Sequence, residues 1–248
     1  MKAKQLNGFL LSIIFICMTA CGGGSSGNGS SYTCSNFYEV ESALENAENG
    51  DTIIPAYELT ESDIDYIRDA LKETIKDIIL DLSDTGLERI SDSAFYNTTK
   101  LVGIILPESV TMIGASAFVG CSGLKEIIIP SKVEIIGMSA FQECTSLEKV
   151  VFAEPSSLLS IGSYAFYKCS SLDNISIPAS VTGIGTTAFG MCGKLAMITV
   201  LRAESPITSL GANCFDGCGS LSQISVPQSV LEEYKNATNW LAYKTLMN

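Results

Sequence analysis

The sequence predicts a solenoid of stacked coils, in which short parallel strands form one β-sheet, turns or 3₁₀ pieces form the other side, and helical caps cover both ends. Three observations predict this fold. A segment of about 23 residues recurs in six copies from residue 88, its apolar residues keep the same places, and no copy alone could bury a core. Of the 248 residues, 46% are hydrophobic and 17% are charged, so the chain can bury a large interior.

Residues 1–20 have the order of a secretory signal, with Lys2 and Lys4 first, then an apolar run, then small residues. The run is too short to span a membrane. It ends in Met-Thr-Ala before Cys21, which resembles the bacterial lipobox and implies that Cys21 is diacylated. Residues 21–35 are then expected to be the acylated cysteine and a flexible tether of Gly, Ser and Asn. Ordinary secretion with an incidental cysteine is the alternative.

Residues 36–82 are predicted to form an acidic helical cap beside the first coil. A first helix covers 36–48, and a second begins near Ser62, where Asp65 forms part of a capping box. Apolar residues recur at helical spacing in the second helix, so we expect it to bury Ile64, Ile67, Leu71 and Ile75. Residues 35–92 hold 16 of the 27 acidic residues and four basic ones, which is typical of a solvated, soluble end.

The six copies occupy residues 88–230 and share the frame I-G-x-x-A-F-x-x-C-x-x-L-x-x-I-x-I-P-x-x-V. Stacking turns each apolar position into a ladder, such as the one formed by Phe95, Phe118, Phe141, Phe166, Phe189 and Phe215. A second ladder contains Leu101, Leu124, Leu147, Leu172, Leu195 and Leu221. The L-x-x-I-x-I part predicts a strand that proline ends, and A-F-x-x-C predicts a tight turn. The recurrent glycine suits a positive φ or a close approach between coils.

This frame resembles the BspA-like leucine-rich repeats, over about 60% of the chain. The segment from Leu80 to Phe95 also looks like the slightly irregular first coil of that family. The resemblance implies a leucine-rich repeat solenoid over residues 83–230. It also implies a surface lipoprotein of host-associated anaerobic bacteria, with adhesion to extracellular-matrix proteins or other bacteria for some members.

Residues 231–248 are predicted to form a C-terminal cap helix, with Ser229 and Glu232 as its capping box. This segment carries the single tryptophan, Trp240. A solenoid needs a cover over its last coil, so we interpret Trp240 as a buried cap residue rather than a platform for a ligand.

Five of the nine cysteines share one repeat position, at Cys121, Cys144, Cys169, Cys192 and Cys218. Equivalent Cα atoms of neighbouring coils lie about 5 Å apart, within disulfide range. Their side chains should point the same way, however, and Thr98 fills the position in the first copy. We therefore predict reduced, buried thiols rather than disulfides. Cys34, in the tether, is expected to be reactive.

The composition excludes several function classes. The chain has no histidine, which removes the Ser-His-Asp and Cys-His constellations and the commonest metal ligand. A net charge of −12 argues against a nucleic-acid partner. No catalytic, metal or cofactor site is predicted, because Cys214 and Cys218 are too few for zinc and Glu88 spoils a calcium-like spacing from Asp81 to Asp92. A carboxylate glycosidase is a weak alternative, without a recognisable carboxylate pair.

The outward residues of the strands form the concave sheet, the usual binding surface of a solenoid. One outward column is first apolar and then hydroxylic, and consists of Ile105, Ile128, Val151, Ser176, Thr199 and Ser225. We expect Lys125 beside Glu148 and Glu126 beside Lys149, so that opposite charges pair across strands. The partner-binding candidates are these four charged residues with Ile105, Ile128 and Val151. Alternatively, β-branched residues merely stack well on an exposed sheet.

These observations together predict a lipid-anchored bacterial surface protein that binds a protein ligand, and the resemblance implies that the ligand is a host matrix protein or a bacterial surface protein. They predict outer-membrane or cell-surface location, no enzyme activity, no nucleic acid and no small-molecule cofactor. The alternative is a structural or assembly lipoprotein of the cell envelope without a host ligand.

Overall fold

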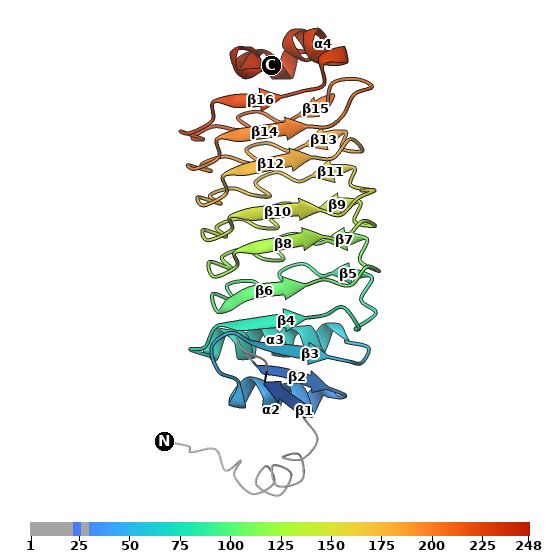
Figure 1. Ribbon diagram of the computed structural model, residues 1–248, viewed down its shortest axis with the longest axis vertical. Coiled ribbons are helices and arrows are strands. Elements are labelled where there is room, and N and C mark those ends of the chain that lie inside the picture. Colours follow the sequence, from blue (N-terminus) through green and yellow to red (C-terminus); the bar gives the residue numbers. More distant parts are fainter. Residues whose placement is uncertain (1–21, 26–29) are drawn as a thin grey trace, which may run out of the picture.

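The protein is one elongated stack of coils along a single axis (Figure 1), seen in a computed structural model that describes residues 22–25 and 30–248. Each repeat places a longer strand on one side of the stack and a two-residue strand on the other. This arrangement is the predicted solenoid of stacked coils with short parallel strands. The predicted signal peptide at residues 1–20, the acylated Cys21 and part of the tether lie outside the described residues.

The longer strands lie side by side in chain order (Figure 1). They are β2 (Ser30–Cys34), β3 (Asp51–Pro55), β4 (Ile78–Asp81), β6 (Leu101–Ile105), β8 (Glu126–Ile129), β10 (Lys149–Phe152), β12 (Asn174–Ile177), β14 (Met197–Val200) and β16 (Gln223–Ser225). Parallel ladders join β2 through β3 and β4 to β6, β8 to β10, and β12 through β14 to β16. Strand β1 (Gly22–Ser25) pairs antiparallel with β2. We call the outward side of β4 to β16 the long-strand face.

The other side of the stack carries a second parallel sheet that the sequence did not predict. Its strands are β5 (Arg89–Ile90), β7 (Met112–Ile113), β9 (Ile135–Ile136), β11 (Ser160–Ile161), β13 (Gly183–Ile184) and β15 (Ser209–Leu210). Each strand has two residues, too few to show the alternation of apolar and polar residues by which a strand is recognised. The A-F-x-x-C segments form tight turns, as predicted.

The N-terminal cap is not purely helical, which corrects the prediction. Helices α2 (Phe37–Asn46) and α3 (Glu61–Glu73) alternate with β2, β3 and β4 as crossovers between parallel strands. The predicted tether is also wrong in its last residues, because Ser30–Cys34 forms β2. Cys34 is buried there, and its Sγ donates to the carbonyl of Tyr32 at 3.6 Å, so the predicted reactive thiol is wrong as well.

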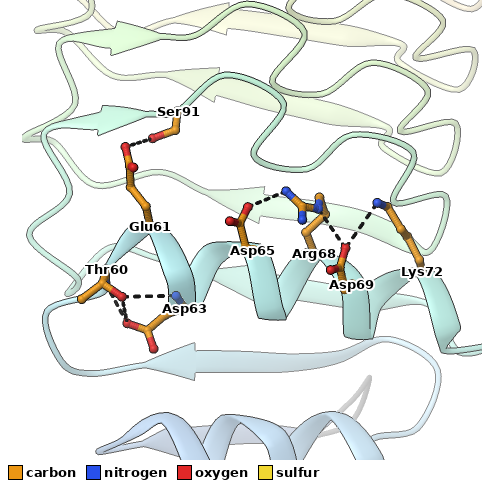
Figure 2. A network of polar contacts seen from close by, with 8 residues as sticks. All are labelled: Thr60, Glu61, Asp63, Asp65, Arg68, Asp69, Lys72 and Ser91. Carbon is orange, nitrogen blue, oxygen red and sulfur yellow. Dashed lines mark hydrogen bonds and ion pairs between the residues drawn. The ribbon is translucent and has the colours of Figure 1, made fainter.

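The N-cap of helix α3 lies two residues before its predicted position. Thr60 is the N-cap, and its side chain and that of Asp63 form a capping box (Figure 2). Because the helix ends at Glu73, Ile75 lies beyond it and is 84% exposed, against the prediction that it is buried. The Oγ of Ser91, in the first repeat, donates to the Oε1 of Glu61 at 2.9 Å and ties the helix to the solenoid (Figure 2).

Two ladders of large side chains fill the interior of the solenoid. The phenylalanine rings stack from coil to coil with centroids 5.1–5.7 Å apart. The leucines are buried in the first five repeats, and Leu221 in the sixth is partly buried. Trp240 is buried next to Phe215, and its indole Nε1 donates to the carbonyl of Ile207 at 3.1 Å. Trp240 is thus a cap residue, as predicted.

The recurrent glycine marks a close approach between coils rather than a positive φ. A Cβ on Gly162 would lie 2.6 Å from the carbonyl carbon of Gly137, a distance that real Cβ atoms do not show. Positive φ values occur instead in the turn, at residues such as Ser93 (58°) and Asn97 (60°). Of the two interpretations of this glycine, the close approach is confirmed.

The C-terminal cap is broken into short pieces instead of one helix. The 3₁₀ turn η1 (Gln228–Val230) leads into α4 (Leu231–Asn236), and the 3₁₀ segment η2 (Thr238–Leu246) follows. The predicted capping box is wrong, because Val230 is the N-cap and makes no side-chain cap bond. The break at Ala237 lets both Tyr234 and Trp240 pack against the last coil, where they meet edge to face at 5.1 Å.

Candidate functional site

The structure places the apolar candidates side by side on the long-strand face. Ile105 is 49% exposed and Ile128 is 54% exposed, while Val151 is half-buried. The register pairs Val151 with Ile128, and the neighbouring inward residues Ile104 and Ile127 are buried. The outward directions predicted for these three residues are therefore correct. Their role in binding stays a prediction.

The charged candidates rim this apolar column. Lys149 Nζ lies 3.8 Å from Oε2 of Glu126, in the predicted pair, with both side chains largely exposed. Such an exposed pair adds little to stability. The second predicted pair, Lys125 with Glu148, is not an ion pair in the described part of the chain, and both side chains are exposed. The rim thus offers two lysines and two glutamates to a partner.

A groove of about 820 Å³ lies over these residues. Its lining includes six of the seven candidates, and also Ile79, Val102, Gly103 and Glu108. Val151 is the candidate outside it. Sequence reasoning missed Ile79 and Glu108. The buried period-two series Ile78, Leu80 and Leu82 would have revealed the strand that carries Ile79.

The second half of the column has the predicted hydroxylic character. The register pairs Ser176 with Thr199 and Thr199 with Ser225. The groove with its exposed isoleucines and charged rim lies over β4 to β10, whereas over β12 to β16 this column is hydroxylic and the neighbouring column carries Asn174, Met197 and Gln223. Exposed apolar area is the usual mark of a protein-binding surface, so the first half is the candidate site.

A second groove of about 760 Å³ lies between α2 and α3. Glu41, Tyr66 and the exposed Ile75 are among the residues that line it. The Tyr66 hydroxyl donates to Oε1 of Glu41 at 2.8 Å, and burial, with that carboxylate, raises the pKa of Tyr66 to about 12. This hydrogen bond joins α3 to α2 across the groove.

The shared cysteines form an inward ladder, as predicted. Each Sγ donates to the phenylalanine carbonyl of the preceding coil at 3.0–3.2 Å, as Cys144 does to Phe118 and Cys169 to Phe141. Burial raises the pKa of the Cys169 thiol. No disulfide is formed among the cysteines of residues 30–248. Their reduced state in the cell stays a prediction.

We expect the buried thiols to be unreactive in the folded protein, because a thiol reacts only when reagent reaches it. In a form that begins at Gly22, Ellman's reagent should react slowly with the native chain, beginning at the partly exposed Cys218. After denaturation all seven remaining cysteines should react. A denatured count well below seven would contradict the prediction and indicate disulfides.

No group of three or more metal-ligating side chains comes together within residues 22–25 and 30–248. In the part of the chain that the structure describes, no helix is long and apolar enough to cross a membrane. Asp81 and Asp92 instead accept backbone hydrogen bonds, from the N–H groups of Ser83 and Ala115.

Comparison with known proteins identifies the repeat. The family described as BspA type leucine rich repeat region matches residues 72–195 and 152–239, more than half of the chain. The T. pallidum leucine-rich repeat protein TpLRR is 26% identical, with a TM-score of 0.54 over 83% of this chain and 81% of that one. A leucine-rich repeat protein from Bacteroides ovatus ATCC 8483 is 24% identical, with a TM-score of 0.44 over 68% of this chain and 53% of that one. No curated protein matches the sequence.

Proteins with these repeats are typically bacterial surface proteins, and the repeats typically mediate protein–protein binding rather than catalysis. The six copies, the parallel strands and the family match agree over the same residues. This chain belongs to the BspA-type leucine-rich repeat family.

Proposed function

We propose that this protein is a lipid-anchored bacterial surface protein whose long-strand face binds a protein partner, as an adhesin for host matrix proteins or other bacteria. The observation that carries the proposal is the groove over β4 to β10. It combines exposed apolar side chains, Ile105 and Ile128, with a charged rim, the combination typical of protein interfaces.

The attachment is proposed on sequence grounds. Residues 1–20 would be removed as a signal peptide, and Cys21 would carry the lipid. Residues 36–82 would form the N-terminal cap, 83–230 the repeat domain and 231–248 the C-terminal cap. Mass spectrometry of the membrane-extracted protein tests the anchor, because an acylated Cys21 gives a lipid-modified N-terminal peptide and a Cys21→Ser variant does not.

Replacing Ile128 by aspartate should strongly weaken partner binding. A charge placed at the centre of an apolar contact must lose its water without gaining a partner. We expect Ile128→Asp to weaken binding by about 30-fold or more, as for a residue at an interface hot spot. The measurement is binding of residues 22–248 to a panel of extracellular-matrix proteins and to whole bacteria.

Ser176→Asp is the matched control, since it adds the same charge in the same column but outside the groove. It should bind like the unaltered protein. Equal binding by folded Ile128→Asp and Ser176→Asp variants would exclude the apolar column as the contact.

Protease treatment of intact cells separates adhesion from the alternative role in envelope assembly. A surface adhesin should be cleaved without lysis, at the same protease concentration that leaves a periplasmic marker intact. Protection of the protein in intact cells would favour the envelope role.

A further inference from the structure

The groove over the long-strand face has a hollow at Gly103. The outward column through Gly103 carries a side chain in every other repeat, at Glu126, Lys149, Asn174, Met197 and Gln223. On the neighbouring strand β4, Ile79 is paired with Gly103. If Gly103 had a Cβ, its three nearest atoms would all belong to the Ile79 side chain, at 3.4–3.9 Å. The missing side chain therefore leaves space beside Ile79 that no other repeat offers.

Apolar side chains line part of the hollow, and Glu126, the equivalent of Gly103 on β8, lines the same groove. Val102, Ile105 and Ile128 line the same groove around Gly103. Strands β6 and β8 are neighbours that form no hydrogen-bonded ladder, and the groove reaches the inward residues Ile104 and Ile127 between them. An apolar side chain that entered here would bury part of its surface against these apolar side chains, and burial of apolar surface is the main source of favourable binding free energy.

The net charge differs between the β10 side and the β4 side of the hollow. Toward β10, Lys149 lies 3.8 Å from Glu126 and offsets its charge. On β4, Asp81 is paired in register with Ile105. Glu108, three residues beyond the end of β6, lines the groove, as does Lys125, just before β8. Beyond β4 the chain is strongly acidic, with 16 acidic and four basic residues in 35–92. Positive charge on a partner is therefore favoured on the β4 side of the hollow.

We propose that the groove holds an extended segment of a partner protein, in which a branched aliphatic side chain fills the hollow at Gly103 and an adjacent lysine or arginine faces Asp81 and Glu108. This inference rests on the proposed function and gives the partner a chemistry. It makes Gly103 the residue that sets specificity, because any side chain there would occupy the place of the anchor.

A pair of labelled synthetic peptides tests the proposal against the chain of residues 22–248. One peptide has a leucine after two lysines, and the other has the same leucine after two glutamates. Titration followed by NMR of the isotope-labelled protein should show the lysine peptide shifting amides of β4 and β6. The glutamate peptide should bind at least tenfold more weakly, and 0.5 M salt should reduce the difference.

Two variants separate the hollow from the charge. Gly103→Val should weaken binding of the lysine peptide at least tenfold. Asn174→Val places a valine in the same column outside the groove and should leave binding of the peptide unchanged. Gly103→Ala fills less of the hollow and should give an intermediate loss, which keeps the test valid if the valine variant folds poorly. Glu108→Lys should reverse the preference between the two peptides.

Unchanged peptide binding by folded Gly103→Val and Gly103→Ala variants, or equal binding of both peptides at low salt, would overturn the inference. The proposed function is judged separately. A different result would be that the unaltered chain binds matrix proteins, with that binding lost in the Ile128→Asp variant, while the lysine peptide does not bind. In that case the long-strand face binds a partner of other chemistry. If neither binds, the proposed function fails with the inference.

Discussion

Phe141→Ala is expected to lower the free energy of unfolding by about 3–5 kcal/mol, the usual cost of deleting a large buried aromatic side chain. Phe141 is buried at the middle of the ladder, with its ring stacked 5.1 Å from that of Phe118 and 5.2 Å from that of Phe166. The cavity would remove contacts on both sides, because each coil is held by its neighbours. Urea unfolding followed by circular dichroism gives the measurement.

Gln142→Ala is the control for this variant, since it alters the next residue, whose side chain is not in the core. Its effect should stay within about 0.5 kcal/mol, as for surface substitutions. A change of less than 1 kcal/mol in Phe141→Ala would mean that the coils can close around the cavity. The phenylalanine ladder would then not be the main support of the solenoid.

Gly162→Ala is expected to destabilise the protein by about 3 kcal/mol, at the upper end of the range for overpacking. The added methyl group would lie 2.6 Å from the carbonyl carbon of Gly137 and 2.6 Å from the nitrogen of Met138. Both atoms are backbone, so no side-chain rotation relieves the clash. The two coils would have to separate locally and lose hydrogen bonds such as that from the Gly162 nitrogen to the Ile136 carbonyl.

Gly193→Ala is the matched control, because it makes the same change where no atom lies within 4 Å of the new Cβ. Its stability should be equal or slightly higher, since alanine restricts the unfolded chain. Equal stabilities for the two variants, measured by urea unfolding, would show that the coils are not packed as closely as the glycine column requires.

The first repeat shows why the recurrent glycine of the repeat frame is needed only where one coil packs on an equivalent coil. It has Ser91 at the glycine position, and its neighbour on that side is helix α3. The Ser91 hydroxyl donates to Glu61 there, whereas a Cβ on Gly114 would meet the Ile90 carbonyl at 2.8 Å. Comparison of the copies in the sequence predicted the column of glycines. Only the packing of the coils showed that the glycines are needed for a close backbone approach and not for a positive φ.

The N-terminal strands show where prediction from sequence failed. Strand β3 begins with Asp51 and ends with Pro55, two residues that disfavour strands. Asp51 is buried because its carboxylate accepts hydrogen bonds from the Ser30 and Glu48 nitrogens, both at 2.6 Å. Ser30 lies on another strand, so the compensation is visible only once the chain is folded.

The sequence by itself determined the repeat, its inward ladders, the outward column from Ile105 to Ser225 and the cap role of Trp240. Six copies in one chain show which positions cannot change, and stacking makes each such position a contact with its own equivalent. The tertiary structure decided the non-periodic features: the strands of the N-terminal cap, the second sheet, and the groove with its hollow at Gly103. These features depend on contacts between segments of different sequence, such as the contact of Ile79 with Gly103. The repeat pattern predicts only the contacts between equivalent positions of neighbouring coils.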